Sequence, residues 1–502
     1  MPRGKSIGNP KERAAPAQWN NYAGAVILEN KKKESTQMST VEKQQDGFKS
    51  QWGFIMACIG SAVGMANIWR FPYMVASYGG LTFLIPYFIF VVLVGASGVM
   101  EEFSLGRFFG AGPVGSFGGA MENGGKSKKL GSALGAIPVI GSMGIAIGYS
   151  VVMGWIFKYT GMSLTGALYG MGQDMAVIGG TFGAAAPETA TLGEGIKMML
   201  DGGIFGVGNG IWIVVAIVVS VVIMCMGIAG GIEKACKIMI PALFGLFLVL
   251  AVYIAFLPGA IDGYKYIFTL NPAGLLNWKV WIYAFGQAFF SLSVAGNGSV
   301  IYGSYLGKDV EISSSAARVA FFDTLAALVA MIVIIPAMAT TGSELSAAGP
   351  GLMFVYLPNV FNGMGFMGRF VGIFFFVAVL FAGVSSIVNL YETPVAFLQE
   401  KVKLARVPAT ITIHVVGLIV ALLIQPWTSQ WMDMISIYIC PLGAALAGVM
   451  FFWVMKKETA LEAVNMGGKK PLGGWFLPFG KWVYVPLCII ALVAGAALGG
   501  IG

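Results

Sequence analysis

The chain has 502 residues, of which 57% are apolar and 11% are charged, and its formal net charge is +8. Its mean hydropathy of +0.79 excludes an ordinary soluble domain, which exposes far more charge. Many apolar runs approach the ~20 residues that cross a bilayer, and the charges gather between these runs. The excess of lysine and arginine is therefore expected to reflect membrane topology and anionic lipid rather than nucleic-acid binding. The sequence predicts a multi-pass membrane protein.

Apolar runs of spanning length predict about eleven transmembrane helices. They are expected at residues 52–75, 82–106, 134–160, 210–228, 235–257, 281–306, 315–341, 366–398, 408–426, 433–455 and 477–500. Because the count is odd, the two ends of the chain are expected on opposite sides of the membrane.

Lysine and arginine in the short loops indicate which side is cytoplasmic. One set of loops is rich in these residues, for example at Lys43, Lys49, Arg107 and Lys234, whereas the other set has few. We therefore expect a cytoplasmic N-terminus and an external C-terminus in the cell (plasma) membrane. Residues 1–47 are polar, of mixed charge and poor in aromatic residues, which favours a disordered cytoplasmic tail.

Cysteine and histidine give little support for metal or redox chemistry. The five cysteines have no C-x-x-C spacing and are interpreted as packing residues: Cys58, Cys225, Cys236, Cys440 and Cys488. The single histidine, His414, lies in an apolar span, where a hydrogen bond between helices is more common than a ligand role.

Two of the apolar runs contain glycine and polar residues at mid-span. The first contains GSAVGMAN (Gly60 to Asn67), and the sixth contains SLSVAGNG (Ser291 to Gly298). Glycine inside a helix costs about 0.5–1 kcal/mol relative to alanine, and unwound backbone at membrane depth survives only where protein or a cavity satisfies it. Close helix packing alone would explain the glycines but not Asn67 and Ser291 beside them. Since the breaks stand five spans apart, the pattern is typical of the inverted repeats of secondary transporters.

Several motifs resemble those of the neurotransmitter:sodium symporter family, in its bacterial branch. They are GSAVGMANIWRFPY from Gly60, EEFSLGR from Glu101, GGIEKACKIMIP from Gly230, GQAFFSLS from Gly286 and FAGVSS from Phe381. The resemblance implies an all-α membrane protein with the LeuT-type fold, in which two inverted five-helix repeats surround broken first and sixth helices. The transport core would span residues 48–455, with repeats at about 48–258 and 279–455, followed by a loop and the eleventh helix at 456–502.

The same resemblance implies two sodium sites. The first would use Ala62, Asn67, Ser291 and Asp323, and the second would use Gly60, Val63, Ala382, Ser385 and Ser386. Carbonyl, hydroxyl and carboxylate oxygens suit a hard cation, independently of ancestry. A fixed carboxylate at Asp323 would replace the chloride that many relatives need, so chloride is not expected to be required.

By correspondence with the family, the substrate would lie between the two breaks. Its pocket would be lined by Ala62, Gly64, Met65, Ala66, Ile145, Tyr149, Phe290, Ser293, Gly296, Ser386 and Leu390. Amine-selective relatives have an aspartate at the position of Gly64, so a substrate with its own carboxylate is expected here. Gly296 stands where a large side chain is common in the family, and the room it leaves favours a large neutral amino acid, hydrophobic or aromatic.

The resemblance also implies gates. Arg70 would pair with Asp433 on the outer side, and Tyr305 with Glu400 would belong to the inner gate. The family's inner-gate arginine and tryptophan read Gln45 and Phe48 here, so the basic partner stays open, with Lys43 or Lys49 as candidates.

The function expected is sodium-coupled import of a neutral amino acid by alternating access, in a monomer or weak homodimer in the lipid bilayer. Open alternatives are a symporter of another small carboxylate-bearing amine and a non-transporting substrate sensor. A channel is disfavoured because a continuous pore would not need two helix breaks with gates on both sides. An enzyme or an ATP-driven pump is disfavoured because H-E-x-x-H, G-x-S-x-G and phosphate-loop patterns are missing from the sequence.

Overall fold

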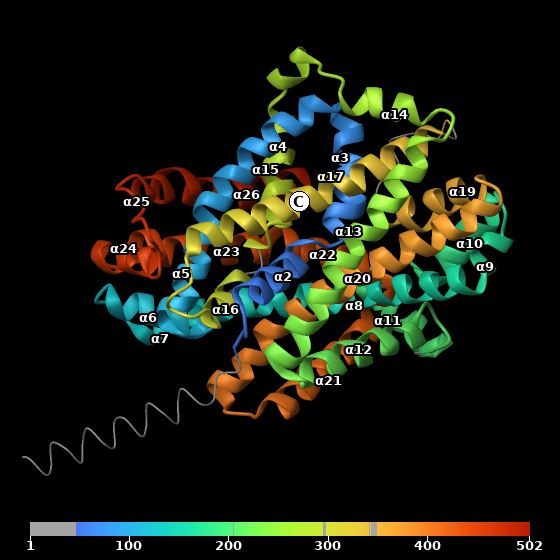
Figure 1. Ribbon diagram of the computed structural model, residues 1–502. Helices are drawn as coiled ribbons and strands as arrows, with labels where there is room; N and C mark the ends of the chain where they lie inside the picture. The colour runs from blue at the N-terminus through green and yellow to red at the C-terminus, as the bar shows by residue number, and fades with distance from the viewer. Residues whose placement is uncertain (1–46, 204, 295–297, 341, 343–348, 502) are drawn as a thin grey trace, which may run out of the picture. The chain divides into compact units, whose positions relative to one another are not determined.

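The structure is a computed structural model, and it describes residues 47–501 except residues 204, 295–297, 341 and 343–348. Gln45 and Gly296 therefore lie outside the described residues, and so does the predicted N-terminal tail except for Gly47. Within the described residues every regular element is a helix (Figure 1). In the part of the chain that the structure describes, seven helical stretches are long and apolar enough to cross a membrane, or eight if the bent pair at the first run is one span.

The first five predicted spans correspond to observed helices. They are α2 (Gln51–Ala62), η1 (Ala66–Arg70), α3 (Phe71–Tyr78), α4 (Leu81–Val94), η2 (Gly95–Val99), α5 (Met100–Phe109), α8 (Ala136–Thr165), α12 (Gly210–Cys225), η3 (Ile228–Ile232) and α13 (Glu233–Ala255). Of these, α12 has only 16 residues, which explains why length alone does not count it as a span.

The other six predicted spans also fall on helices. They are α15 (Trp278–Ser291), α16 (Gly298–Ser304), α17 (Ile312–Ala339), α20 (Phe366–Phe397), η7 (Leu398–Val402), α21 (Arg406–Ile424), η8 (Gln425–Trp427), α22 (Thr428–Met434), η9 (Ile435–Ile439), α23 (Cys440–Val449), η10 (Met450–Val454), α25 (Phe476–Phe479), η11 (Gly480–Tyr484) and α26 (Val485–Leu498). The ninth and tenth predicted spans join through η8 into one helical stretch of 49 residues, so the helices are consistent with the eleven expected spans.

Several connecting segments are helical although no helix was predicted there. They are α6 (Pro113–Asn123), α7 (Lys128–Leu134), α9 (Ala167–Gly170), α10 (Met175–Ala185), α11 (Leu192–Gly202), α14 (Ala260–Ile267), η4 (Pro272–Leu276), α18 (Gly349–Gly351), η6 (Leu352–Tyr356), α19 (Leu357–Asn362) and α24 (Lys457–Asn465). Helix α11 begins where the sequence provides a cap, since Thr191 and Glu194 form a reciprocal capping box.

The first predicted break is a bend of 57° between α2 and the following helical pair. Val63 leaves the helix in an extended conformation (ψ 95°) after its N–H bonds to the Ile59 carbonyl. The N–H of Gly64 then bonds to Oδ1 of Asn67, 3.1 Å away. A side-chain amide thus satisfies part of the backbone that the break leaves without helical partners.

The second predicted break follows α15. Ser293 takes a left-handed conformation (φ 58°), which is uncommon for a residue other than glycine, and α16 begins at Gly298. The Ser293 hydroxyl donates to the carbonyl of Ser61, at 2.9 Å. The two interrupted helices are therefore joined to each other at their breaks.

The remaining helices pack around these two broken ones. Helices α8 and α20 pack extensively on each other, and α20 also packs on α2 (Figure 1). Helix α5 packs on α16 so closely that a Cβ on Gly106 would overlap the Val300 carbonyl, which explains a glycine there. The predicted hydrogen bond of His414 is confirmed: Nδ1 donates to the Thr410 carbonyl, and Nε2 lies 2.9 Å from the Ser220 hydroxyl on α12.

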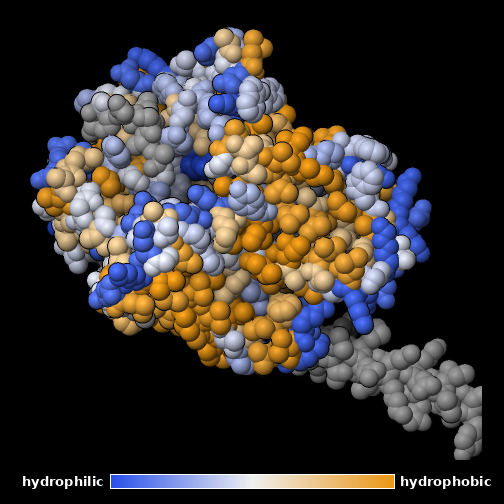
Figure 2. Space-filling model, turned by 180° about the vertical axis from the view of Figure 1, so that it is seen from behind, coloured by the Kyte–Doolittle hydropathy of each residue, from blue (hydrophilic) through white to orange (hydrophobic). Residues whose placement is uncertain are grey.

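The surface agrees with a membrane location. Figure 2 shows a broad field of hydrophobic residues on one face, bordered by hydrophilic ones. Large apolar side chains such as Val92 (70% exposed) and Phe256 (84% exposed) face outward from the bundle. Lipid covers such surface in a membrane protein, whereas in water it would be a large exposed apolar patch.

Candidate functional site

A cavity of about 320 Å³ lies between the two breaks. Its walls come from the first break, α8, α15, α20 and the α22 to α23 region. The lining residues are Ser61, Ala62, Gly64, Met65, Ala66, Trp69, Arg70, Ser142, Ile145, Tyr149, Val152, Phe290, Ser293, Gly298, Ser386, Asn389, Leu390, Met432, Asp433, Ser436 and Cys440. Every residue predicted to line the substrate pocket is among them, except Gly296, which lies outside the described residues.

The three side chains predicted for the first sodium site meet beside this cavity. Nδ2 of Asn67 lies 2.8 Å from Oδ1 of Asp323 and 3.1 Å from Oγ of Ser291, and the Ser291 hydroxyl donates to Oδ2 of Asp323 at 2.7 Å. All three are fully buried. A buried carboxylate is costly unless it is hydrogen-bonded or paired with a cation, and here the helix break brings an amide and a hydroxyl to it.

The residues predicted for the second sodium site form a separate cluster of oxygens. The Ser386 hydroxyl donates to the carbonyls of Gly60 (3.2 Å) and Val63 (3.1 Å), and the Ser385 hydroxyl donates to the Ala382 carbonyl at 2.9 Å. A Cβ on Gly60 would lie 3.0 Å from the Ser385 Cβ, so the close approach of α2 to α20 leaves little room for a side chain there.

The wall between the two clusters is tight around Gly64. A Cβ at this position would lie 3.1 Å from Ser386 Oγ and 3.4 Å from the Tyr149 hydroxyl. The Tyr149 hydroxyl is buried, and none of the described residues forms a hydrogen bond with it. This hydroxyl is therefore free to bond a bound molecule at the first break.

The two residues predicted for the outer gate face the same cavity. Arg70 and Asp433 both line it and interact electrostatically, but the described residues include no direct ion pair between them. Nε of Arg70 is buried and has no hydrogen-bond partner in the part of the chain that the structure describes. The structure thus brings the two side chains to one opening without closing it.

A smaller cavity of about 70 Å³ adjoins this opening and is shared with the end of the chain. Arg70 and Asp433 line it together with the residues from Gly499 to Ile501. Ile501 is buried (2% exposed), and its backbone packs on Gly286 of α15, where any Cβ would overlap it.

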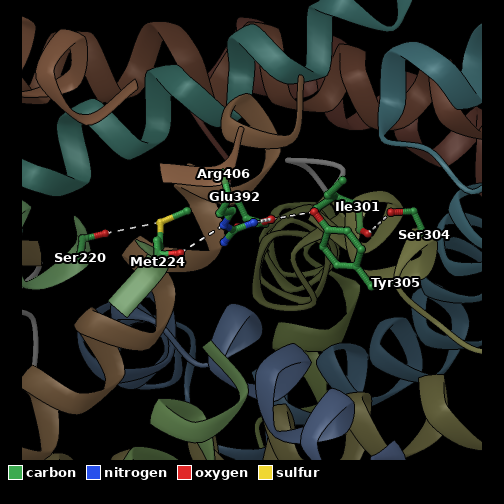
Figure 3. A network of polar contacts seen from close by, with 7 residues as sticks. All are labelled: Ser220, Met224, Ile301, Ser304, Tyr305, Glu392 and Arg406. Atoms are coloured by element: carbon green, nitrogen blue, oxygen red, sulfur yellow. Dashed lines mark hydrogen bonds and ion pairs between the residues drawn. The ribbon is translucent and has the colours of Figure 1, made fainter. Parts of the chain in front are cut away.

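Tyr305 and Glu400, the two residues predicted for the inner gate, have different partners in the structure. Figure 3 shows that Tyr305 points to Glu392 instead, and its hydroxyl donates to Oε1 at 2.7 Å. Arg406 bonds both carboxylate oxygens of Glu392 (2.6 and 2.7 Å), and its Nε donates to the Met224 carbonyl. Glu400 accepts a hydrogen bond from the N–H of Gly112. The buried acid nearest to Tyr305 is therefore Glu392.

Phe48 stands beside this network. Its ring lies 5.4 Å from that of Phe54, 5.6 Å from that of Tyr302 and 6.3 Å from that of Tyr305, measured between ring centroids. Phe48 is therefore part of an aromatic cluster that includes the predicted gate residue Tyr305. The backbone N–H of Lys49 donates to Oε2 of Glu233 at 2.7 Å, so this lysine contributes its main chain to the start of α2.

Sequence reasoning missed nine of the lining residues. They are Ser61, Trp69, Ser142, Val152, Gly298, Asn389, Met432, Ser436 and Cys440. Asn389 carried a signal that could have found it, because it is a polar residue in an apolar run and lies three positions after Ser386, on the same helical face. Met432 and Cys440 carry no such signal in an apolar span.

A bundle of apolar helices, with two of them interrupted around a cavity and with buried oxygens at the interruptions, defines a membrane carrier for a small solute. The chain matches the sequence profile of the Sodium:neurotransmitter symporter family over residues 45–172 and 193–497. It therefore belongs to this family, and it is a sodium-dependent membrane transporter with the LeuT-type fold rather than an enzyme.

Individual relatives agree with this assignment. The chain is 31% identical over 472 residues to an uncharacterized sodium-dependent transporter of Methanocaldococcus jannaschii, with 90% of each chain covered. It is 27% identical over 318 residues to the sodium-dependent neutral amino acid transporter B(0)AT2 of Mus musculus, which covers 61% of this chain and 42% of that one. The crystal structure of MhsT in complex with L-phenylalanine superposes with a TM-score of 0.73 at 29% identity, covering 90% of this chain and 99% of that chain.

Proposed function

We propose that this protein imports a large neutral amino acid, hydrophobic or aromatic, together with sodium by alternating access. The observation that carries the proposal is that two buried oxygen clusters form at the first helix break, which itself borders the cavity. Asn67, Ser291 and Asp323 form one cluster, and Ser386 with the carbonyls of Gly60 and Val63 forms the other. Apart from the Asn67 amide nitrogen, each cluster offers only oxygen ligands to a cation. When a cation binds, the Asn67 amide would rotate so that Oδ1, and not Nδ2, faces the cation.

The substrate class is supported by the shape of the pocket and by a relative. Gly64 brings no carboxylate into the cavity, so an α-carboxylate of the substrate would supply that charge, with the Tyr149 hydroxyl as its donor. Apolar side chains such as Ile145, Val152 and Leu390 line much of the rest. The related MhsT was crystallised with L-phenylalanine, which is a molecule of this kind.

In the proposed transport cycle Arg70 and Asp433 close the outer side after binding, and the Glu392 to Arg406 pair opens on the inner side. The predicted outer gate is unpaired here and the inner network is complete, an arrangement that suits a state open to the outside. Two sodium ions, a cytoplasmic N-terminus, an external C-terminus and independence of chloride belong to the same proposal.

The test is uptake by the purified protein in liposomes. We expect labelled leucine, phenylalanine or another large neutral amino acid to accumulate against its gradient when sodium is imposed outside, and not when potassium replaces it. Asn67→Ala and Ser386→Ala should lower accumulation by about tenfold or more, because each removes a cation ligand.

Ser104→Ala is the matched control. It also removes a buried hydroxyl, but this one bonds to the Met100 carbonyl away from the cavity, so uptake should be kept. If folded Asn67→Ala and Ser386→Ala proteins accumulated amino acid equally with and without sodium, the proposal would be wrong. Sodium-dependent binding without any flux would instead identify a sensor.

A further inference from the structure

One polar side chain in the cavity wall has no role in the proposed sodium and carboxylate sites. Asn389 lies on α20, one residue before Leu390, and is 3% exposed. It lines the central cavity three residues beyond Ser386, which places it about 4.5 Å further along the helix axis. It is therefore part of the cavity wall on the far side of Ser386, next to Leu390.

The amide of Asn389 is held in one orientation by its nitrogen. Nδ2 donates to the Ser385 carbonyl (2.5 Å) and more weakly to the Ala57 carbonyl (3.5 Å). Oδ1 is buried, and no donor among the described residues reaches it. A buried acceptor left without a donor costs about 1–3 kcal/mol, so such an atom in a binding cavity calls for a partner.

Three serine hydroxyls in the same cavity are already occupied. The hydroxyl of Ser142 donates to the Leu390 carbonyl at 2.8 Å, and that of Ser293 donates to the Ser61 carbonyl. Ser386 donates to carbonyls of the first break. Tyr149, whose hydroxyl is also unpaired, adjoins Gly64 and is used in the carboxylate site. Asn389 Oδ1 is thus left as an acceptor for another part of the substrate.

We propose that Asn389 selects substrates whose aromatic side chain carries a hydrogen-bond donor, a phenol O–H or an indole N–H. This inference rests on the proposed function, and it refines the substrate class to tyrosine-like and tryptophan-like amino acids. Apolar walls at Ile145, Val152 and Leu390 bury the ring, and the donor at its edge completes Asn389. A site built to receive a donor discriminates against the isostere that lacks it, because the buried acceptor then stays unpaired.

The first test varies the ligand and leaves the protein unchanged. Tyrosine, phenylalanine and 4-fluorophenylalanine are titrated as competitors of sodium-dependent binding of a labelled amino acid to the wild-type transporter. Tyrosine should compete at about threefold to tenfold lower concentration than phenylalanine, and 4-fluorophenylalanine, which fills the space without donating, should resemble phenylalanine. Equal competition by tyrosine and phenylalanine would overturn the inference.

The second test varies the protein. Asn389→Leu should bring the ratio of tyrosine to phenylalanine potency to about one, whereas Ser142→Ala, whose hydroxyl is committed to a backbone carbonyl, should keep the wild-type ratio. A tyrosine preference that survives in folded Asn389→Leu would also overturn the inference. If the wild-type protein showed no sodium-dependent binding at all, the proposed function itself would be contradicted. This result differs from binding without a tyrosine preference, which would contradict only the inference about Asn389.

Discussion

Asn67 and Asp323 meet at the break of the first helix, with Nδ2 of Asn67 2.8 Å from Oδ1 of Asp323, although 256 residues separate them in the chain. The Asp323 carboxylate is fully buried, and Tyr87 interacts with it electrostatically. In the proposed first sodium site this carboxylate supplies the negative charge that balances the ion.

The charge of Asp323 gives the first prediction. Wild-type uptake should be equal in chloride and gluconate media, and Asp323→Asn should lower the apparent sodium affinity about tenfold to a hundredfold, because a charged ligand becomes neutral. Chloride should restore part of the lost affinity in the variant. Sodium titrations of uptake in both media measure this, and a strong chloride requirement in the wild type would remove the proposed role of Asp323.

A cysteine in the cavity wall gives the second prediction. Cys440 and Asp433 both line the central cavity, whereas Cys58, Cys236 and Cys488 are buried outside it, and the half-buried Cys225 does not line it either. A charged thiol reagent added from the Asp433 side should therefore inactivate the wild type through Cys440, and sodium with substrate should slow the reaction. The uptake of Cys440→Ser should be the same with and without the reagent. If this variant were inactivated as strongly as the wild type, the reactive thiol would lie elsewhere.

The pair of Glu392 and Arg406 gives the third prediction. Glu392 is fully buried and its carboxylate is bonded by both terminal nitrogens of Arg406. Arg406→Gln should destabilise the protein by about 3–5 kcal/mol, because it leaves a buried charge without compensation. The double variant Glu392→Gln with Arg406→Gln should recover much of this loss. Thermal unfolding in detergent measures both, and a double variant less stable than Arg406→Gln would argue against a paired buried charge.

A second buried acid gives the fourth prediction. Glu101 is fully buried, and none of the described residues bonds to either of its carboxylate oxygens. Replacing an unpaired buried acid by an apolar residue of similar size removes a desolvation cost. Glu101→Met should therefore raise the unfolding temperature by a few degrees and keep uptake. A fall of more than about 5 °C would show that Glu101 makes a stabilising interaction in the folded protein.

The sequence identified the parts of the site that break its own local rules. Glycines together with Asn67 in one apolar run, and with Ser291 in another, are expensive in a membrane unless they serve a purpose, and both runs are interrupted in the structure. The cavity residues followed from the family motifs around those breaks, and ten of the eleven lie in the described lining.

Other features depend on tertiary contacts that no local pattern records. Tyr305 bonds Glu392, which lies 87 positions away in the sequence, and this contact was not predicted. The unpaired Oδ1 of Asn389 becomes visible only when the partners of its nitrogen are known. The short helices between spans were missed because they are amphipathic or capped by single residues such as Asp174, and not long apolar runs.

The packing of Ile501 on Gly286 has a practical side. Gly499, Gly500 and Ile501 line the same small cavity as Arg70 and Asp433. A bulkier side chain at Gly286 would displace Ile501, so this substitution at a distance from the central cavity would change the wall that Arg70 and Asp433 share.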